Sequence, residues 1–245
     1  MIDFYLNYRM TAFIETIEIS NANIAKLMGL FSDENLLPNV YNETIINSPN
    51  PIQSPTLELR NMQNSWILKF GTGRVDILRI KQSSTSDIGN IEDFVAWANN
   101  CLEKILCGFD RKANRIAFAT NCVMKELSSD KLDCIYKKIV SPISFYSQNI
   151  PFEWSIRNVS KKDLAILDQK ENVNFSSILS LAEIVVNENG NIAKSQRVIL
   201  DFDINSIPDN TALRFSIGHI KSFISTILDY HNSITDEYIK IVSHE

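Results

Sequence analysis

The sequence predicts an α+β fold with two related halves, each an antiparallel sheet packed by a long amphipathic helix. The first observation is the composition, because 44% hydrophobic and 22% charged residues, with seven Gly and seven Pro in 245, are typical of a globular chain. The second is the pattern: each half has short segments of alternating apolar and polar residues, then a long segment with apolar residues at helical spacing. We expect one unit at residues 1–127 and another at 128–245, packed together as one compact body.

The first predicted unit contains strands, a hairpin and one long helix. Gly71-Thr72-Gly73 predicts a tight turn between two strands, because glycine reaches positive φ at little cost. Residues 32–54 are rich in Pro and Asn and predict an irregular loop. The other expected elements are strands at 12–19, 56–60, 65–70, 74–80 and 114–122, a short helix capped by Asn21 or Asn23, and a long helix at 90–107 capped by Asn90 and ended by Gly108.

The second predicted unit repeats this order of strands and a long helix. Asn189-Gly190 is a strong signal for a type I′ hairpin turn between two strands. A long apolar stripe then predicts a helix at 209–231, and a last short helix follows Ser233. The other expected elements are a helix at 130–139, strands at 143–146 and 152–157, a short helix near Ser160, and the paired strands at 176–186 and 197–204.

Charge and cysteine usage exclude several classes of protein. A net charge of −5 and a pI near 5.3 argue against broad nucleic-acid binding, which needs Lys and Arg gathered on one face. No apolar stretch approaches the roughly 20 residues of a membrane span, and the first ten residues lack the pattern of a secretion signal. The four cysteines share no CxxC spacing, which favours structural thiols over a disulfide framework or a zinc site. We expect a cytoplasmic protein without a cofactor.

Two aspartates on one predicted strand are the candidate metal ligands. In Leu200-Asp201-Phe202-Asp203 the two carboxylates project from one face, since alternate residues of a strand share a face. Such a pair could hold a divalent metal, with Glu183 as a possible third ligand. The opposite face, with Val198, Leu200, Phe202 and Ile204, equally predicts an ordinary strand with one buried and one wet side, and we favour this second interpretation.

The long C-terminal helix offers a candidate partner-binding surface. Phe215 and Phe223 lie on a second apolar stripe, and apolar residues on two sides of a helix imply burial on both sides. We therefore predict that these two phenylalanines contact a partner. The sequence has no nucleophile elbow, no Walker A lysine and no HExxH, so no catalytic residue is assigned.

Two segments resemble a known family. Residues 114–127, NRIAFATNCVMKEL, are similar to the Arg-Ile-x-Leu-Arg-Tyr-Ile-Asn segment of a sporadically distributed prokaryotic family of similar length and unassigned function. The segment ILDFDIN, the helix after it and HNSITDEYIKI resemble that family's closing pattern. The resemblance implies an accessory protein of patchy distribution, as the products of mobile or anti-phage gene cassettes are.

Three functional hypotheses follow. The leading one is a non-enzymatic interaction or adaptor subunit of a multi-component bacterial system, in anti-phage defence, whose partner is another protein or a second copy of the chain. One alternative is a metal-dependent nuclease or other hydrolase that uses Asp201, Asp203 and Glu183. The other is a small-molecule or peptide-binding module, with a ligand on a concave sheet face lined by Trp66 or Trp154.

Overall fold

One sheet of nine strands extends through the described part of the chain. The computed structural model describes residues 1–45, 52–140, 142–188 and 191–243. Neighbouring strands are antiparallel, in the order β2-β3-β4-β5-β1-β6-β9-β8-β7. The strands are β1 (Ile2–Ile14), β2 (Leu37–Ile45), β3 (Ile52–Arg60), β4 (Trp66–Gly71), β5 (Arg74–Ile80), β6 (Ala113–Met124), β7 (Trp154–Ile166), β8 (Gln169–Glu188) and β9 (Asn191–Ser206).

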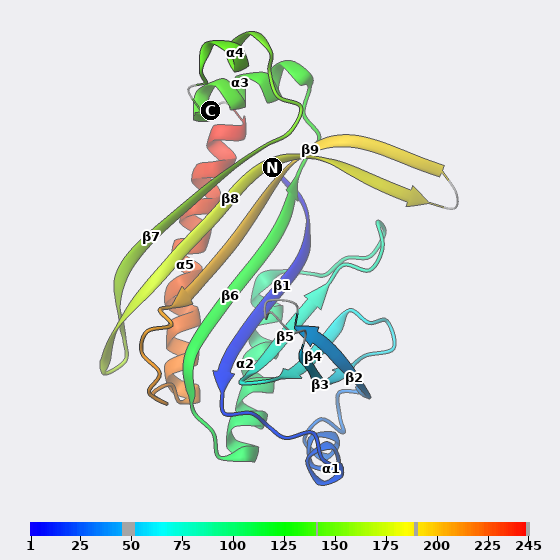
Figure 1. Ribbon diagram of the computed structural model, residues 1–245, viewed down its shortest axis with the longest axis vertical. Coiled ribbons are helices and arrows are strands. Elements are labelled where there is room, and N and C mark those ends of the chain that lie inside the picture. The colour runs from blue at the N-terminus through cyan, green and yellow to red at the C-terminus, as the bar shows by residue number, and fades with distance from the viewer. Residues whose placement is uncertain (46–51, 141, 189–190, 244–245) are drawn as a thin grey trace.

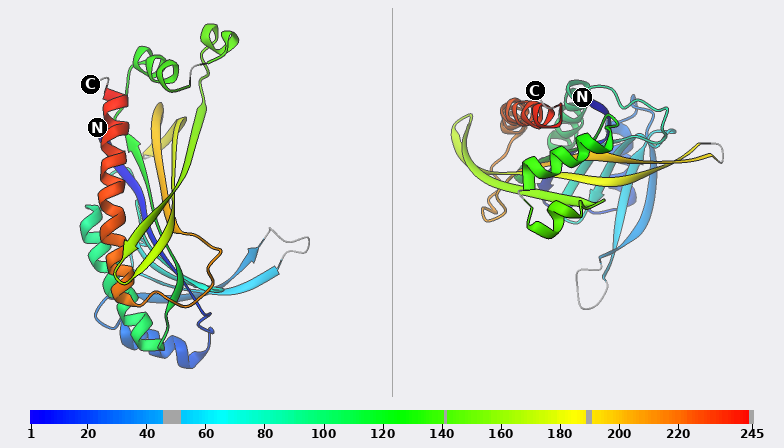
Figure 2. Two further views of the ribbon diagram at one scale, coloured as in Figure 1. Left: turned by 90° about the vertical axis from the view of Figure 1, so that its left-hand side faces the viewer. Right: turned by 90° about the horizontal axis from the view of Figure 1, so that it is seen from above.

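Two long helices cover one face of this sheet. These are α2 (Ile91–Phe109) and α5 (Ile217–Ser243), which lie side by side behind the strands (Figure 1). The short helix α1 (Asn21–Leu30) lies at one end of the molecule, with α3 (Ser129–Val140) and α4 (Ser144–Gln148) at the other. On the side away from the helices, which we call the open face, the β2–β3 hairpin projects outward (Figure 2). Within the described ranges, no helix is both long and apolar enough to cross a membrane.

The predicted α+β class is confirmed, and the two predicted units share the one sheet. Strands β1 to β6 with α2 come from the first unit, and β7 to β9 with α5 from the second. The units join where β6 pairs with β9, from Ala117 opposite Asn205 to Val123 opposite Ile199. Whether the halves are related to each other stays a prediction.

The core lies between the sheet and the two long helices. Phe94 on α2, Phe118 on β6 and Phe223 on α5 are fully buried there. His231 on α5 is also buried, and its Nε2 lies 3.0 Å from the hydroxyl of Thr120 on β6. A second apolar cluster, at the end where α3 lies, completes the core and comprises Cys122, Met124, Leu132, Ile135, Tyr136, Trp154, Leu179, Leu181, Val198, Leu200, Phe202 and Val242.

Several predicted elements of the first unit are wrong in extent. The predicted strand at 12–19 is the end of a strand that begins at Ile2 and stops at Ile14, and α1 is capped by Ser20. The predicted loop at 32–54 contains β2, because Pro38 is tolerated on this edge strand. Pro55 on β3 is tolerated too, since β4 pairs only with residues 57–60. The strand at 74–80, the Asn90 cap and the turn at Gly73 are confirmed.

Helix ends and the segment after α3 are also corrected. Gly108 lies inside α2, which ends at Phe109 and is capped by Asp110, whose φ of 49° is left-handed. The predicted strand at 143–146 is α4, and the predicted helix near Ser160 is part of β7, which pairs with β8 over its full length. The long C-terminal helix begins at Ile217, after the predicted start at Asp209, and continues without a break through Ser233. The predicted turn at Asn189-Gly190 lies outside the described residues.

Candidate functional site

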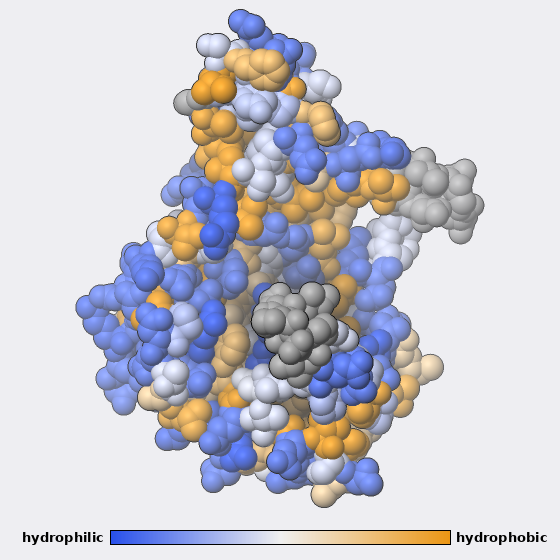
Figure 3. Space-filling model, viewed as in Figure 1, coloured by the Kyte–Doolittle hydropathy of each residue, from blue (hydrophilic) through white to orange (hydrophobic). Residues whose placement is uncertain are grey.

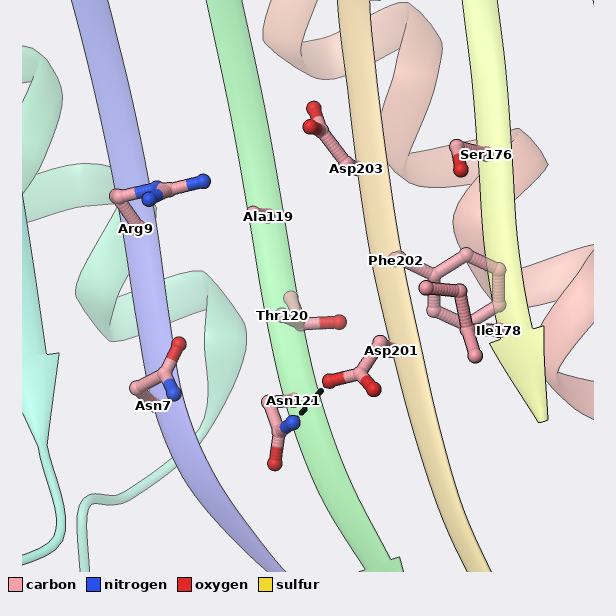
Figure 4. A pocket seen from close by; sticks show the side chains of 10 residues that line it. All are labelled: Asn7, Arg9, Ala119, Thr120, Asn121, Ser176, Ile178, Asp201, Phe202 and Asp203. Carbon is pink, nitrogen blue, oxygen red and sulfur yellow. Dashed lines mark hydrogen bonds between the residues drawn. The ribbon is translucent and has the colours of Figure 1, made fainter. Parts of the chain in front are cut away.

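The first candidate site is a polar pocket on the open face. Asp201 and Asp203 point to this face, whereas Val198, Leu200, Phe202 and Ile204 on the same strand are at most 4% exposed, so the predicted buried side of this strand is confirmed. The strand register places side chains in two rows across β1, β6, β9 and β8. The rows are Arg9, Ala119, Asp203 and Ser176, then Asn7, Asn121, Asp201 and Ile178. They line a pocket of about 250 Å³ (Figure 4).

The two carboxylates of this pocket are held by amides. Asn121 Nδ2 donates to Asp201 Oδ1, and Asn205 Nδ2 donates to Asp203 Oδ1 at 2.9 Å. Burial raises the pKa of Asp201, and the hydrogen bond from Asn121 opposes this shift. Among the described residues, no Lys, Arg or His lies within 4.0 Å of either carboxylate. The carboxylates of the pocket are therefore not paired with a cation among the described residues.

Arg9 stands on the opposite side of the pocket from the aspartates. Its side chain extends from β1 toward Ala119 on β6 (Figure 4). Because Ala119 carries only a methyl group, the surface between Arg9 and Asp203 stays low. Arg9 is exposed and makes no ion pair within the described ranges, so its charge faces the pocket and solvent.

Glu183 is not part of this pocket. It pairs with Gln196, five residues along β9 from Asp201, which corresponds to about 17 Å at the usual rise of a strand. Its carboxylate accepts instead from Lys194 Nζ at 2.9 Å on the protein surface. No group of three metal-ligating side chains occurs in the part of the chain that the structure describes. The predicted metal site thus keeps two of its three ligands in one place and lacks a third.

The second candidate site is an apolar surface around α4, which we call the cap patch. Its side chains come from the connection between α3 and β7, where Figure 3 shows hydrophobic residues gathered at the upper end of the molecule. The rings of Phe145 and Tyr146 lie 5.3 Å apart. The patch consists of Ile143 (70% exposed), Phe145 (63%), Tyr146 (45%) and Phe152 (78%). The four side chains come from one stretch of chain, residues 143–152, and several large exposed apolar side chains in such a stretch are a mark of an interaction surface.

A second pocket adjoins the cap patch. It has a volume of about 170 Å³ and is lined by Phe152, Trp154, Leu132 and Leu181, with polar residues at its rim. Trp154 is 8% exposed, and its indole N–H is buried without a hydrogen-bond acceptor among the described residues. A buried donor without an acceptor costs free energy, so this indole could donate to a group that enters the pocket.

A two-stranded ribbon, which we call the arm, extends from the sheet beside this patch. The pairing of β7 with β8 stops at Leu181, and the pairing of β6 with β9 stops at Ile199. Residues 182–188 and 191–197 therefore pair only with each other, and the arm projects from the body (Figure 1). At its base, Gln196 Nε2 donates to the carbonyl of Phe152 at 3.0 Å.

The predicted partner-binding phenylalanines lie in the core. Phe215 and Phe223 are both 0% exposed. Phe215 precedes α5 and exchanges backbone hydrogen bonds with Ala113, while Phe223 packs between α5 and the sheet. Packing within the chain accounts for the second apolar stripe. The aromatic residues of the cap patch were missed because their segment reads as strands in the sequence.

The predicted tryptophan-lined ligand face also differs from the structure. Trp66 packs against Trp97 on α2, with ring centroids 4.2 Å apart, and thus faces the helices. Trp154 packs near Tyr136 on α3, at 6.1 Å. Neither of them lines the pocket on the open face.

Comparison with known proteins adds no family assignment. No protein-family model matches the chain, and no curated protein shows significant similarity to it.

Proposed function

We propose that this protein is a non-enzymatic interaction or adaptor subunit that binds a protein partner through the cap patch and the arm. The observation that carries the proposal is the exposure of four large apolar side chains beside the base of an unsupported ribbon. Large exposed aromatic rings that lie together provide the anchors on which protein interfaces depend. The partner is another protein or a second copy of the chain.

The arm supplies a second mode of contact. A two-stranded ribbon is only marginally stable in water, and both of its outer edges carry unpaired N–H and C=O groups. A strand from a partner could pair with either edge, which gives affinity through main-chain hydrogen bonds. The cap patch at the base of the arm would add the apolar contact area.

The resemblance of residues 114–127 and of the C-terminal segment supports the setting of this activity. It favours a cytoplasmic, multi-component bacterial system of anti-phage defence, in which this chain would need no cofactor of its own. The shared order of strands and a long helix supports descent of residues 1–127 and 128–245 from one ancestral unit.

The test compares two double variants. Phe145→Ser with Phe152→Ser removes the anchors of the cap patch, and Met62→Ser with Leu167→Ser removes two equally exposed apolar side chains elsewhere. The protein is purified from its native host, co-purifying proteins are identified by mass spectrometry, and the complex is rebuilt from purified components. We expect the Phe145→Ser, Phe152→Ser variant to lose binding of the partner protein or, if the partner is a second copy of the chain, to lose the self-association measured by light scattering. The Met62→Ser, Leu167→Ser variant should retain the same binding. A monomer that binds no purified candidate, or equal binding by both variants, contradicts the proposal.

A further inference from the structure

The polar pocket on the open face has the charge distribution of a binding site for a small charged ligand. Arg9 contributes a formal charge of +1, and Asp201 and Asp203 contribute −2, so the lining carries a formal net charge of −1. The positive group stands on β1 and the negative groups stand on β9, with the small side chain of Ala119 between them (Figure 4). Opposite charges on opposite walls favour a ligand with two charged ends.

Arg9 forms no ion pair with Asp201 or Asp203 among the described residues. Two strand spacings separate Arg9 from Asp203, about 10 Å between their Cα atoms. A molecule seated over Ala119 would fill this space and meet a charge at each end. A bulkier residue at position 119 would fill the same space from within the chain.

One further acceptor belongs to a residue of the same pocket lining. Asn121 donates to Asp201 through Nδ2, but its own Oδ1 is buried without a donor among the described residues. A bare metal ion fits less well, because the pocket offers two carboxylates and also places a positive guanidinium nearby.

From this geometry we infer that the pocket binds a basic α-amino acid, with the α-carboxylate at Arg9 and the cationic side chain at Asp201 and Asp203. The net charge of +1 on such a ligand offsets the charge of the pocket. Partial burial of Asp201 and Asp203 strengthens the ion pair at this end of the ligand relative to an exposed one. This inference does not depend on the cap patch or the arm.

Calorimetric titration of the purified full chain with a series of ligands tests the inference. L-arginine and L-lysine should bind. Agmatine, which lacks the carboxylate, and citrulline, which lacks the cationic charge, should each bind at least tenfold more weakly. Equal binding of agmatine and arginine, binding of Mg²⁺ or Mn²⁺ in place of the amino acids, or no binding of any of them would overturn it.

Variants locate the site independently of the ligand series. Asp203→Asn and Arg9→Gln should each weaken arginine binding at least tenfold, and Ala119→Leu should abolish it by filling the space between the walls. Glu183→Gln removes an exposed carboxylate on the same sheet but outside the pocket, so it should bind as the unmodified protein does. Circular dichroism confirms that each variant is folded. Loss of binding in Glu183→Gln, or full binding in folded Ala119→Leu, would place the ligand elsewhere.

Discussion

Arg214 and Glu171 form a buried, two-point ion pair that ties the start of β8 to the segment before α5. Arg214 Nε lies 2.6 Å from Glu171 Oε1, and Nη2 lies 2.9 Å from Oε2. The side chains are 11% and 6% exposed. Arg214 also donates to the carbonyls of Asn114 and Asn210, so one guanidinium holds three segments together.

Removal of one member of this pair should destabilise the fold strongly. We expect Glu171→Ala to lower the free energy of unfolding by about 3–5 kcal/mol, because the guanidinium would stay buried without a counter-charge. Urea unfolding followed by circular dichroism measures the change. The exposed pair between Lys170 and Asp163 is the control, and Asp163→Ala should cost about 1 kcal/mol or less. If both substitutions lowered the free energy of unfolding equally, burial of the Arg214–Glu171 pair would not be the cause of its effect on stability.

His231 should make stability fall in mild acid. Its ring is 1% exposed and lies between Phe118 and Phe202, with its nitrogens near Thr120 and Asn232. Burial lowers its pKa below the ordinary value of 6.5, although Asn232 and Glu92 oppose the shift. Below pH 6.5 the unfolded chain therefore binds a proton that the folded chain does not, so this contribution is complete above 6.5 and is lost as the pH falls.

Unfolding measured at pH 7.5 and at pH 5.5 checks this expectation. His231→Gln should reduce the difference in stability between the two conditions by up to about 1.4 kcal/mol, the value of one pH unit below 6.5. His219→Gln is the matched control, because His219 is at the surface beside Asp168. An unchanged pH dependence of stability in His231→Gln, or its loss in His219→Gln, would contradict this role of His231.

The thiols should separate into two classes. Cys101 and Cys122 are buried, and burial raises the pKa of both, that of Cys122 to about 12. Cys107 and Cys134 are exposed. Since the thiolate is the reactive form, an alkylating reagent followed by mass spectrometry should modify the exposed pair first and the buried pair only on unfolding. Rapid modification of Cys101 in the folded protein would contradict its placement.

Two helix glycines should respond differently to alanine. A Cβ on Gly29 in α1 would meet nothing within 4 Å, whereas one on Gly108 in α2 would lie 2.7 Å from Leu30 Cδ1. Gly29→Ala should thus stabilise the protein by about 0.5–1 kcal/mol through helix propensity. Gly108→Ala should gain less, because Leu30 must move. In a Leu30→Ala background the two substitutions should give equal gains, and thermal unfolding of the set measures this.

Hydrophobic periodicity predicted most of the strands and both long helices, because each buries one face against the same core. For that reason Phe94 on α2 and Ile220 on α5 each belong to a stripe of buried apolar residues at helical spacing. On β9 the buried Leu200 and Phe202 alternate with Asp201 and Asp203, which face the opposite side of the sheet. Only the start of β7 was predicted, by the strand at 152–157. The rest of β7 was missed because residues from Ser155 to Asp163 are largely exposed and the pairing with β8 decides their conformation. Strand β2 was missed because it contains Pro38, which is tolerated there since β2 lies at the edge of the sheet and pairs with β3 alone.

Residues of the candidate sites could be predicted together from the sequence only where they lie on the same strand. Asp201 and Asp203 share a strand, so their common face follows from alternation alone. Arg9, Asn121 and Ser176 reach the same pocket through strand register between segments up to 190 residues apart, which no local pattern specifies. Phe215 and Phe223 were expected at a surface because the sequence does not reveal how many sides of a helix its own chain covers.

The position of β1 constrains how the chain can be made. This strand precedes both of its partners in the chain, yet it lies between β5 and β6 in the middle of the sheet, and those partners are residues 74–80 and 113–124. During synthesis β1 must therefore wait for residues 74–80 before it can form its first native strand pairing. For the same reason a fragment that ends after β6 would expose the edge that β9 normally covers, and would tend to aggregate by pairing with other fragments.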